Sequence, residues 1–298
     1  MTLDDYRRFY AEEIRFAANV NSPALVEAFA RVPREKFLGP GPWQIAFPDL
    51  ARGGAVHTTI DDPRHLYHNV LISLDAARNL SNGQPGSLAH WINALNLKAG
   101  DRVFHMGCGV GYYTAIMAEV VGAGGSVVAI EVDAGLAARA RENLADYPNV
   151  TVHAGDGATL DPGPCDAMLI NAGVTHPHPP WLERLRPGGR MILPITVARG
   201  TTGLGQGIMA KIVRERGGYT ADIVTFVAIY SCSSVREPEL EPVLGKAIAT
   251  GALMKLKSVR RDPHEPTETC VVHAREVCLS SAEVATGLEA VAPAEAVE

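Results

Sequence analysis

The sequence has few cysteines and no long apolar run. Its 5 cysteines are scattered over 298 residues without a C-x-x-C pair, which argues against a disulfide framework or a zinc site. No segment approaches the roughly 20 apolar residues of a membrane-spanning helix. The first residues, MTLDD, have neither the basic start nor the apolar stretch of a signal peptide. We therefore expect a cytoplasmic protein that has no membrane partner and binds no metal.

Positive charge is also scarce. The chain has 27 Lys and Arg against 33 Asp and Glu, a formal net charge of −6, and no basic run that could follow a phosphate backbone. Nucleic acid is therefore not expected as a partner. Hydrophobic residues make up 47% of the chain and charged residues 20%, which is typical of a globular protein of one large or two small domains.

The most informative segment is a glycine-rich turn between an apolar strand and a helix. Residues 103–113 read VFHMGCGVGYY, with glycine at 107, 109 and 111. Glycine lets the backbone turn sharply and a ligand come close, and the helix that follows presents unpaired N–H groups to that ligand. Twenty residues after Gly111, a second apolar strand ends in Glu131, whose carboxylate can accept both hydroxyls of a ribose.

The spacing of the glycines distinguishes between nucleotide ligands. A dinucleotide-binding G-x-G-x-x-G motif needs its third glycine at the position of Tyr112. Here that glycine comes one residue earlier, and the loop has no Arg or Lys for a pyrophosphate. The pattern is similar to the S-adenosyl-L-methionine (SAM) loop of class I methyltransferases. Cys108 is interpreted as a small residue that fits the turn, because no group that would activate a nucleophile is evident.

Strands and helices alternate between residues 102 and 195. Strands are expected near 102–106, 126–131, 150–154, 165–171 and 189–194, and helices near 112–122, 134–146 and 178–185. This order predicts a Rossmann-like, doubly wound α/β fold with a mostly parallel sheet. Gly107, Glu131, Asp156 and Asn171 each follow a strand. Since ligands of such sheets bind beyond the carboxyl ends of the strands, these four residues should share one rim.

The chain is expected to have three parts. They are a helical N-terminal and lid segment (1–80), a methyltransferase core with an antiparallel C-terminal strand (81–235), and a small C-terminal extension (236–298). Residues 39–65 are rich in Gly, Pro and Asp and are expected to be irregular; with the 79–85 loop they are the candidate lid. The last residues, from Ala282, are expected to fray.

Further elements are expected outside the alternating core. They are helices over 2–19, 22–31, 85–97 and 238–250, antiparallel strands over 207–216 and 219–231, and short strands over 253–259, 269–274 and 277–280.

Four motifs, in the same order, resemble the protein-L-isoaspartate O-methyltransferases over roughly residues 20–230. They are RVPREKF at 31–37, NGQP at 82–85 with 21 residues before Gly107, NV and GDG within 149–157, and PGGRMILP at 187–194. The segment after about residue 236 lies outside the resemblance.

The resemblance implies SAM as methyl donor and S-adenosylhomocysteine (SAH) as product. By position, Glu131 would bind the ribose hydroxyls, and Asp156 with the backbone of Gly157 and Ala158 would hold the adenine edge. The expected cofactor-binding residues are His105, Gly107, Cys108, Gly109, Gly111, Tyr112, Tyr113, Glu131, Val132, Asp156, Gly157, Ala158 and Asn171.

One departure from the family concerns the methyl donor. His105 stands where the family has an acid that helps to hold the methionine ammonium of SAM. A neutral imidazole accepts one hydrogen bond without charge assistance. Either another carboxylate substitutes for the acid or SAM binds less tightly. His105 could also be a strand-end residue with no role in ligand binding.

The other departure concerns the acceptor. The family's T-I-S-Q-P segment corresponds here to Ser81, Asn82, Gly83, Gln84 and Pro85, so the serine hydroxyl near the acceptor carboxyl is missing or shifted. Ser81 to Gln84 are the expected catalytic segment, in which Asn82 could supply an amide donor. The Asn-Gly pair could also be only a turn.

These observations predict a SAM-dependent O-methyltransferase. Its substrate would be a carboxylate: an isoaspartyl-type residue of a protein or peptide, or a related peptide or small-molecule acid. Such an acceptor has a pKa near ~4, so it is ionised at neutral pH and needs no general base. A hydroxyl or amine would need one, for which the candidates are His65, His68, His105 and His176.

The alternative is a non-catalytic SAM-binding module that acts through a protein partner. His105 and Gly83 favour this alternative, whereas the intact glycine loop, Glu131 and Asp156 favour the enzyme. The sequence leaves the oligomeric state open.

Overall fold

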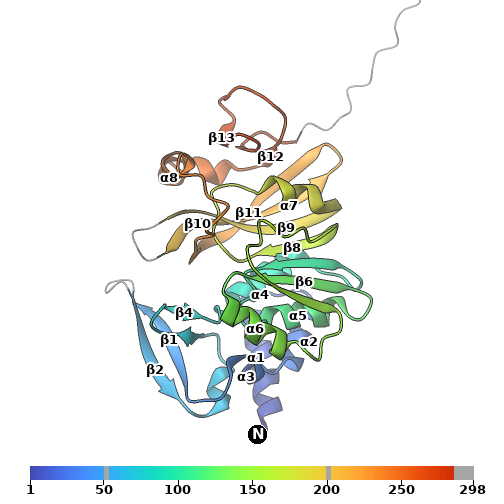
Figure 1. The fold of residues 1–298 in the computed structure, drawn as a ribbon, viewed down its shortest axis with the longest axis vertical. Coiled ribbons are helices and arrows are strands. Elements are labelled where there is room, and N and C mark those ends of the chain that lie inside the picture. Colours follow the sequence, from blue (N-terminus) through green and yellow to red (C-terminus); the bar gives the residue numbers. More distant parts are fainter. Residues whose placement is uncertain (50–53, 199–202, 285–298) are drawn as a thin grey trace, which may run out of the picture.

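A ten-stranded mixed sheet runs through the molecule (Figure 1). The computed structural model describes residues 1–49, 54–198 and 203–284. The strand order is β13-β14-β12-β11-β10-β9-β8-β5-β6-β7. No helix in these three ranges is long and apolar enough to cross a membrane.

One half of this sheet is parallel, as the alternating pattern predicts. Its strands are β5 (Arg102–Met106), β6 (Ser126–Glu131), β7 (Val150–Ala154), β8 (Cys165–Ile170) and β9 (Leu185–Ala198). Alternate residues enter two separate cores: Val103 belongs to one buried cluster, whereas Phe104 and Met106 belong to the other. This alternation follows from the two-residue period of a strand that is covered on both faces.

Helices cover the two faces. They are α4 (Pro85–Leu95), α5 (Tyr112–Val121), α6 (Ala134–Asn143) and α7 (Pro179–Arg184). α4 and α5 contribute buried residues to the cluster of Val103, and α7 contributes to the cluster of Phe104. The expected doubly wound α/β fold is thus confirmed.

The other half of the sheet is antiparallel, and the two antiparallel strands expected over 207–216 and 219–231 are confirmed. β10 (Leu204–Glu215) pairs with both β9 and β11 (Gly218–Tyr230). The C-terminal extension adds α8 (Leu240–Ala249), η2 (Ala252–Lys255), β12 (Ser258–Arg260), β13 (Cys270–His273) and β14 (Cys278–Ser280). Its three strands continue the main sheet. The expected strand over 253–259 was wrong in its first half, which is the η2 turn.

The N-terminal helices are α1 (Leu3–Ala17), α2 (Pro23–Arg31) and α3 (Arg34–Leu38). Thr2 and Asp5 form a capping box at the start of α1, and Ser22 caps α2 ahead of Pro23. These caps satisfy backbone N–H groups that the first helical turn leaves unpaired, which explains why both helices begin where the sequence predicts.

The expectation that residues 39–65 are irregular was wrong. A four-stranded sheet of order β2-β1-β3-β4 consists of β1 (Trp43–Asp49), β2 (Gly54–Ile60), β3 (Leu71–Asp75) and β4 (Leu80–Ser81). The η1 turn (Pro63–Leu66) follows β2. Glycine and proline masked the strands in the sequence, whereas strand pairing depends on partners such as Trp43 and Ile60. The segment 1–80 is therefore only partly helical.

Arg34 ties this small sheet to the main body. Its guanidinium is fully buried and donates to the carbonyls of Leu66 (2.6 Å), His68 (3.0 Å) and Val70 (2.8 Å). It also lies 6.0 Å from the centre of the Tyr112 ring, at the start of α5. A buried charge needs such partners, and here they fix the segment leading into β3 beside the helix that follows the glycine loop.

Candidate active site

The ends of the parallel strands meet at one rim. The side-chain amide of Asn171 donates to the carbonyl of Gly107 (3.3 Å), and the backbone N–H of Gly155 donates to the carbonyl of Glu131 (2.9 Å). Asp156 follows Gly155 directly. The predicted convergence of the residues after β5, β6, β7 and β8 is therefore confirmed.

Glu131 holds the glycine loop. One carboxylate oxygen accepts the backbone N–H of Gly109 at 2.8 Å, and the other accepts the N–H of Asp133 at 3.1 Å. The side chain is nearly buried, with Glu131 only 7% exposed. A carboxylate has about four acceptor positions, so two remain for the hydroxyls of a ribose.

The glycines of the loop serve different purposes. Gly109 has a φ of +56°, and a Cβ there would meet nothing within 4 Å. Its backbone thus borders open space. Gly111 has a φ of +92°, and a Cβ there would lie 2.7 Å from Leu144 Cδ1. Gly111 is needed for close packing near the end of α6, whereas Gly109 leaves room beside the rim.

The segment from Asp156 to Ala158 is held on several sides. Asp156 Oδ1 accepts the N–H of Ala158 at 2.9 Å and the hydroxyl of Ser234 at 2.8 Å. The indole of Trp181 donates to the carbonyl of Gly157 (3.2 Å). Asp156 is thus a turn-capping residue, and its second oxygen accepts none of these bonds. Sequence reasoning missed Ser234, which lies outside every recognisable motif.

His105 is fully buried at the end of β5. Its Nδ1 lies 2.8 Å from Thr114 Oγ1, and its Nε2 has no hydrogen-bond partner among the described residues. Burial lowers the pKa of His105 to about 3, so the imidazole is neutral at physiological pH. It cannot replace the negative charge of an acid beside the methionine ammonium, and its role in binding SAM stays a prediction.

Other predicted residues of the glycine loop are placed differently. The ring of Tyr112 is buried against Phe37, so that its side chain belongs to the core. Burial raises the pKa of the Cys108 thiol to about 12, which keeps it protonated and agrees with its interpretation as a small filling residue. Val132 is 65% exposed.

The predicted acceptor loop, residues 81–84, contacts α5, the helix that follows the glycine loop. The hydroxyl of Tyr113 donates to the carbonyl of Gly83 at 3.1 Å. Gly83 has a φ of +69°, and a Cβ there would lie 3.0 Å from Leu88 Cδ2, so this loop conformation favours glycine over serine. Ser81 lies in β4, opposite Ser73.

Asn82 is the unusual residue of this loop. It is 7% exposed, and its side-chain Nδ2 has no partner among the described residues. A buried donor without a partner costs about 1–3 kcal/mol, which a ligand that accepts its hydrogen bond would offset. Gln84 precedes α4 and forms no side-chain cap.

The other histidines that were candidates for a general base differ in their burial. His65 and His68 are exposed. His176 is buried beside Thr175 Oγ1 (2.9 Å from Nδ1) and 3.4 Å from Glu237. Burial lowers the pKa of His176.

A separate hollow of about 660 Å³ lies away from the rim. It is lined by the C-terminal end of α5 and by residues 146–149, at the opposite end of that helix from the glycine loop. The hollow is therefore distinct from the expected donor site at the rim.

The doubly wound sheet and the glycine loop, with the acids Glu131 and Asp156 at the rim, define a class I SAM-dependent methyltransferase. Comparison with known proteins specifies this further. The family model of protein-L-isoaspartate(D-aspartate) O-methyltransferase (PCMT) matches residues 11–228, well over half of the chain. The chain belongs to the PCMT family, and it is a SAM-dependent enzyme of carboxyl methylation. This membership favours the enzyme over the non-catalytic module.

Individual relatives agree with this result. A protein-L-isoaspartate O-methyltransferase of Ignicoccus hospitalis is 32% identical over 200 residues, covering 65% of this chain and 82% of that protein. One of Archaeoglobus fulgidus is 33% identical over 199 residues, with the same coverage of 65% and 82%.

Solved structures share the fold. A protein-L-isoaspartate O-methyltransferase structure matches with a TM-score of 0.60 and 21% identity, covering 81% of this chain and 69% of that chain. A putative PCMT of Plasmodium falciparum in complex with SAH matches with a TM-score of 0.56 and 16% identity, covering 76% and 98%.

The position of Glu131 gives a direct prediction. In Glu131→Gln the amide NH₂ would face either the N–H of Gly109 or that of Asp133, and one acceptor for the ribose would be lost. We expect SAH to bind roughly 10- to 100-fold more weakly, as measured by calorimetry. Glu142→Gln removes the same charge from an exposed position on α6 and should change binding little. Equal affinity of the two variants would contradict the assignment.

Proposed function

We propose that the chain methylates the free carboxylate of an isoaspartyl residue in a protein or peptide. The observation that carries the proposal is the buried side-chain amide of Asn82, which has no hydrogen-bond partner in the part of the chain that the structure describes. It lies in the loop that Tyr113 of α5 contacts through the carbonyl of Gly83. Further support comes from membership of the PCMT family and from relatives named for this activity.

The chemistry requires alignment more than proton transfer. An isoaspartyl carboxylate is ionised at neutral pH and attacks the sulfonium methyl of SAM in line. Holding two reactants in such a geometry can lower the barrier by about 7–11 kcal/mol. His105 is neutral and Cys108 is protonated, so neither adds a competing charge or nucleophile near the loop.

Asn82 would orient the acceptor. Its Nδ2 can donate to one carboxylate oxygen, which leaves the other oxygen to attack the methyl group. The cost of burying an unpaired amide would then be offset when substrate is bound. In this account Asn82 takes over the role of the hydroxyl that the family places at the position of Gly83.

The β1–β2 hairpin would cover the bound peptide. It projects beside the main body, and β3 and β4 join it to the acceptor loop (Figure 1). Phe47 and Val56 lie opposite each other on this hairpin and are 72% and 48% exposed. Exposed apolar pairs of this kind often mark a binding surface. The expected lid would therefore be an ordered hairpin.

Labelled-methyl transfer tests the substrate. We expect an isoaspartyl peptide to accept methyl groups from SAM, its aspartyl twin to accept far fewer, and the product to be labile to base, as an ester is. Equal transfer to both peptides would contradict the isoaspartyl proposal and favour another peptide acid. A base-stable product would contradict carboxyl methylation.

Substitution of Asn82 tests the acceptor loop. Asn82→Asp keeps the shape but replaces the donor with a charge that repels the acceptor carboxylate. We expect kcat/KM for the peptide to fall roughly 10- to 100-fold while SAH binding is retained. Asn79→Asp adds the same charge three residues away at an exposed position and is the matched control. A similar loss in both variants would remove the role of Asn82.

Hydrogen exchange tests the lid. Amides of β1 and β2 should exchange more slowly when SAH and peptide are bound together, because closure buries the exposed pair. Amides of α2 provide an internal reference that should not change. Unchanged exchange throughout the hairpin would rule out its closure over substrate.

A further inference from the structure

The C-terminal extension gathers four metal-binding side chains. His264, Cys270, His273 and Cys278 come from β13, β14 and the loop before them, and one possible ligand atom of each lies within 4.8 Å of the others. All four lie beyond residue 228, where the match to the family model ends. The family relationship therefore gives no account of this cluster.

The spacing of the cluster suits a tetrahedral ion. Zinc binds thiolates at about 2.3 Å and imidazoles at about 2.0–2.1 Å, which places neighbouring ligand atoms roughly 3.3–3.8 Å apart. Cys270 Sγ lies 3.5 Å from His264 Nε2. His273 and Cys278 are direct partners in the register of β13 and β14. The centroids of the two imidazole rings are 4.7 Å apart, and the ring planes are nearly perpendicular, at 80°.

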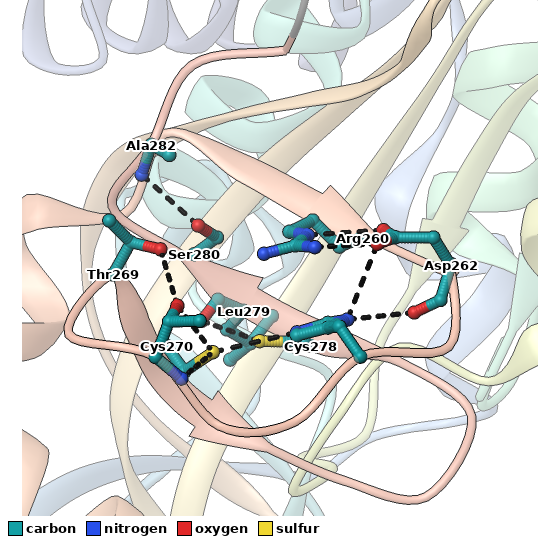
Figure 2. Close-up of polar contacts among 10 residues, drawn as sticks. Arg260, Asp262, Thr269, Cys270, Cys278, Leu279, Ser280 and Ala282 are labelled. Carbon is teal, nitrogen blue, oxygen red and sulfur yellow. Dashed lines mark hydrogen bonds and ion pairs between the residues drawn. The ribbon is translucent and has the colours of Figure 1, made fainter.

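Contacts around the cluster orient its members. His264 Nδ1 lies 2.7 Å from the carbonyl of Asp262, which directs the other ring nitrogen, Nε2, toward Cys270. Figure 2 shows Asp262 bound in turn by Arg260, whose Nε donates to Oδ1 at 3.0 Å. Metal-binding histidines usually have such a carbonyl or carboxylate on the second nitrogen.

The two cysteines lie within reach of one ion. The backbone N–H of Thr267 donates to Cys270 Sγ at 3.2 Å. The two sulfur atoms lie close together in Figure 2, and two thiolates would balance the charge of a divalent cation.

His273 adds an independent observation. Its Nδ1 is buried and has no hydrogen-bond partner among the described residues. A buried imidazole nitrogen without a partner is costly, which suggests that this part of the extension is built around a ligand. All five cysteines are free thiols in this structure.

We propose that His264, Cys270, His273 and Cys278 bind a structural zinc ion. Two sulfur and two nitrogen ligands in a tetrahedron are typical of zinc. Four protein ligands leave no open position for a substrate, so the ion would be structural and not catalytic. It would fasten the 261–269 loop and β13 to β14, and through β14 to the end of the main sheet.

The absence of C-x-x-C pairs predicts that the chain has no zinc site. The proposed ligands instead follow the mixed spacing H-x5-C-x2-H-x4-C. The pairing of β13 with β14 and the return of the loop bring them together, and neither is visible in the spacing alone.

Metal analysis of the full chain tests the proposal. The protein is purified without a polyhistidine tag under reducing conditions, and its metal content is measured by mass spectrometry. We expect one zinc ion per chain. Cys278→Ser and His264→Ala should lose zinc to a chelator at least about tenfold more readily, whereas His264→Cys, which restores a ligand of the Cys₃His type, should retain it.

Cys165→Ser provides the matched control. Cys165 is a buried cysteine of β8 whose thiol lies 3.3 Å from the carbonyl of Gly163, a contact that serine can keep, so zinc content should not change. Replacement of zinc by cobalt gives a second readout: a thiolate-to-cobalt absorption band that Cys278→Ser weakens.

Three results would overturn the proposal. The first is that the wild-type protein contains no zinc and binds none when zinc is added. The second is that Cys270 and Cys278 form a disulfide in place of the metal site. The third is that both Cys278→Ser and His264→Ala retain zinc fully.

Discussion

The hydrogen bonds of the Glu131 carboxylate hold the glycine loop, and the proposed donor site depends on them. The carboxylate lies at the end of β6 and accepts backbone N–H groups from Gly109 and Asp133, so that one acid fixes both the glycine loop and the start of α6. A loop with three glycines at positive φ has little conformational preference of its own. The Glu131 carboxylate fixes the conformation of the loop by accepting the N–H of Gly109. Its oxygens also have acceptor positions left for a ribose.

The predictable part of the molecule is the part governed by local rules. The carboxyl ends of parallel strands fall at one edge of a sheet, so Gly107, Glu131 and Asp156 could be placed together from their positions after apolar strands. The helices α1 and α2 were predictable for a similar reason, because their caps lie next to them in sequence.

Features that depend on distant partners were not predictable. Ser234 reaches Asp156 across 78 residues, and Tyr113 reaches Gly83 across 30; each contact requires the complete fold. The β1–β2 hairpin escaped detection because its strands are defined by their pairing, while their glycines and proline indicated a loop. The His and Cys cluster was missed since its spacing becomes meaningful only in the register of β13 and β14.

The chain thus combines a methyltransferase rim with two further features. The predicted acceptor loop has Gly83 at a φ of +69° beside Asn82, whose Nδ2 has no partner within residues 1–49, 54–198 and 203–284. The antiparallel half of the sheet ends in the extension that carries the proposed zinc site. In the proposals above, the first would select the carboxylate that is methylated, and the second would hold the far end of the sheet.

The central claim is that the rim binds the nucleoside of SAM through Glu131. A crystal structure of the chain with SAH tests this most directly. The account predicts the ribose hydroxyls within hydrogen-bond distance of the Glu131 carboxylate and the adenine beside residues 156–158. A nucleoside bound elsewhere, or a rim that stays empty at saturating SAH, would contradict it.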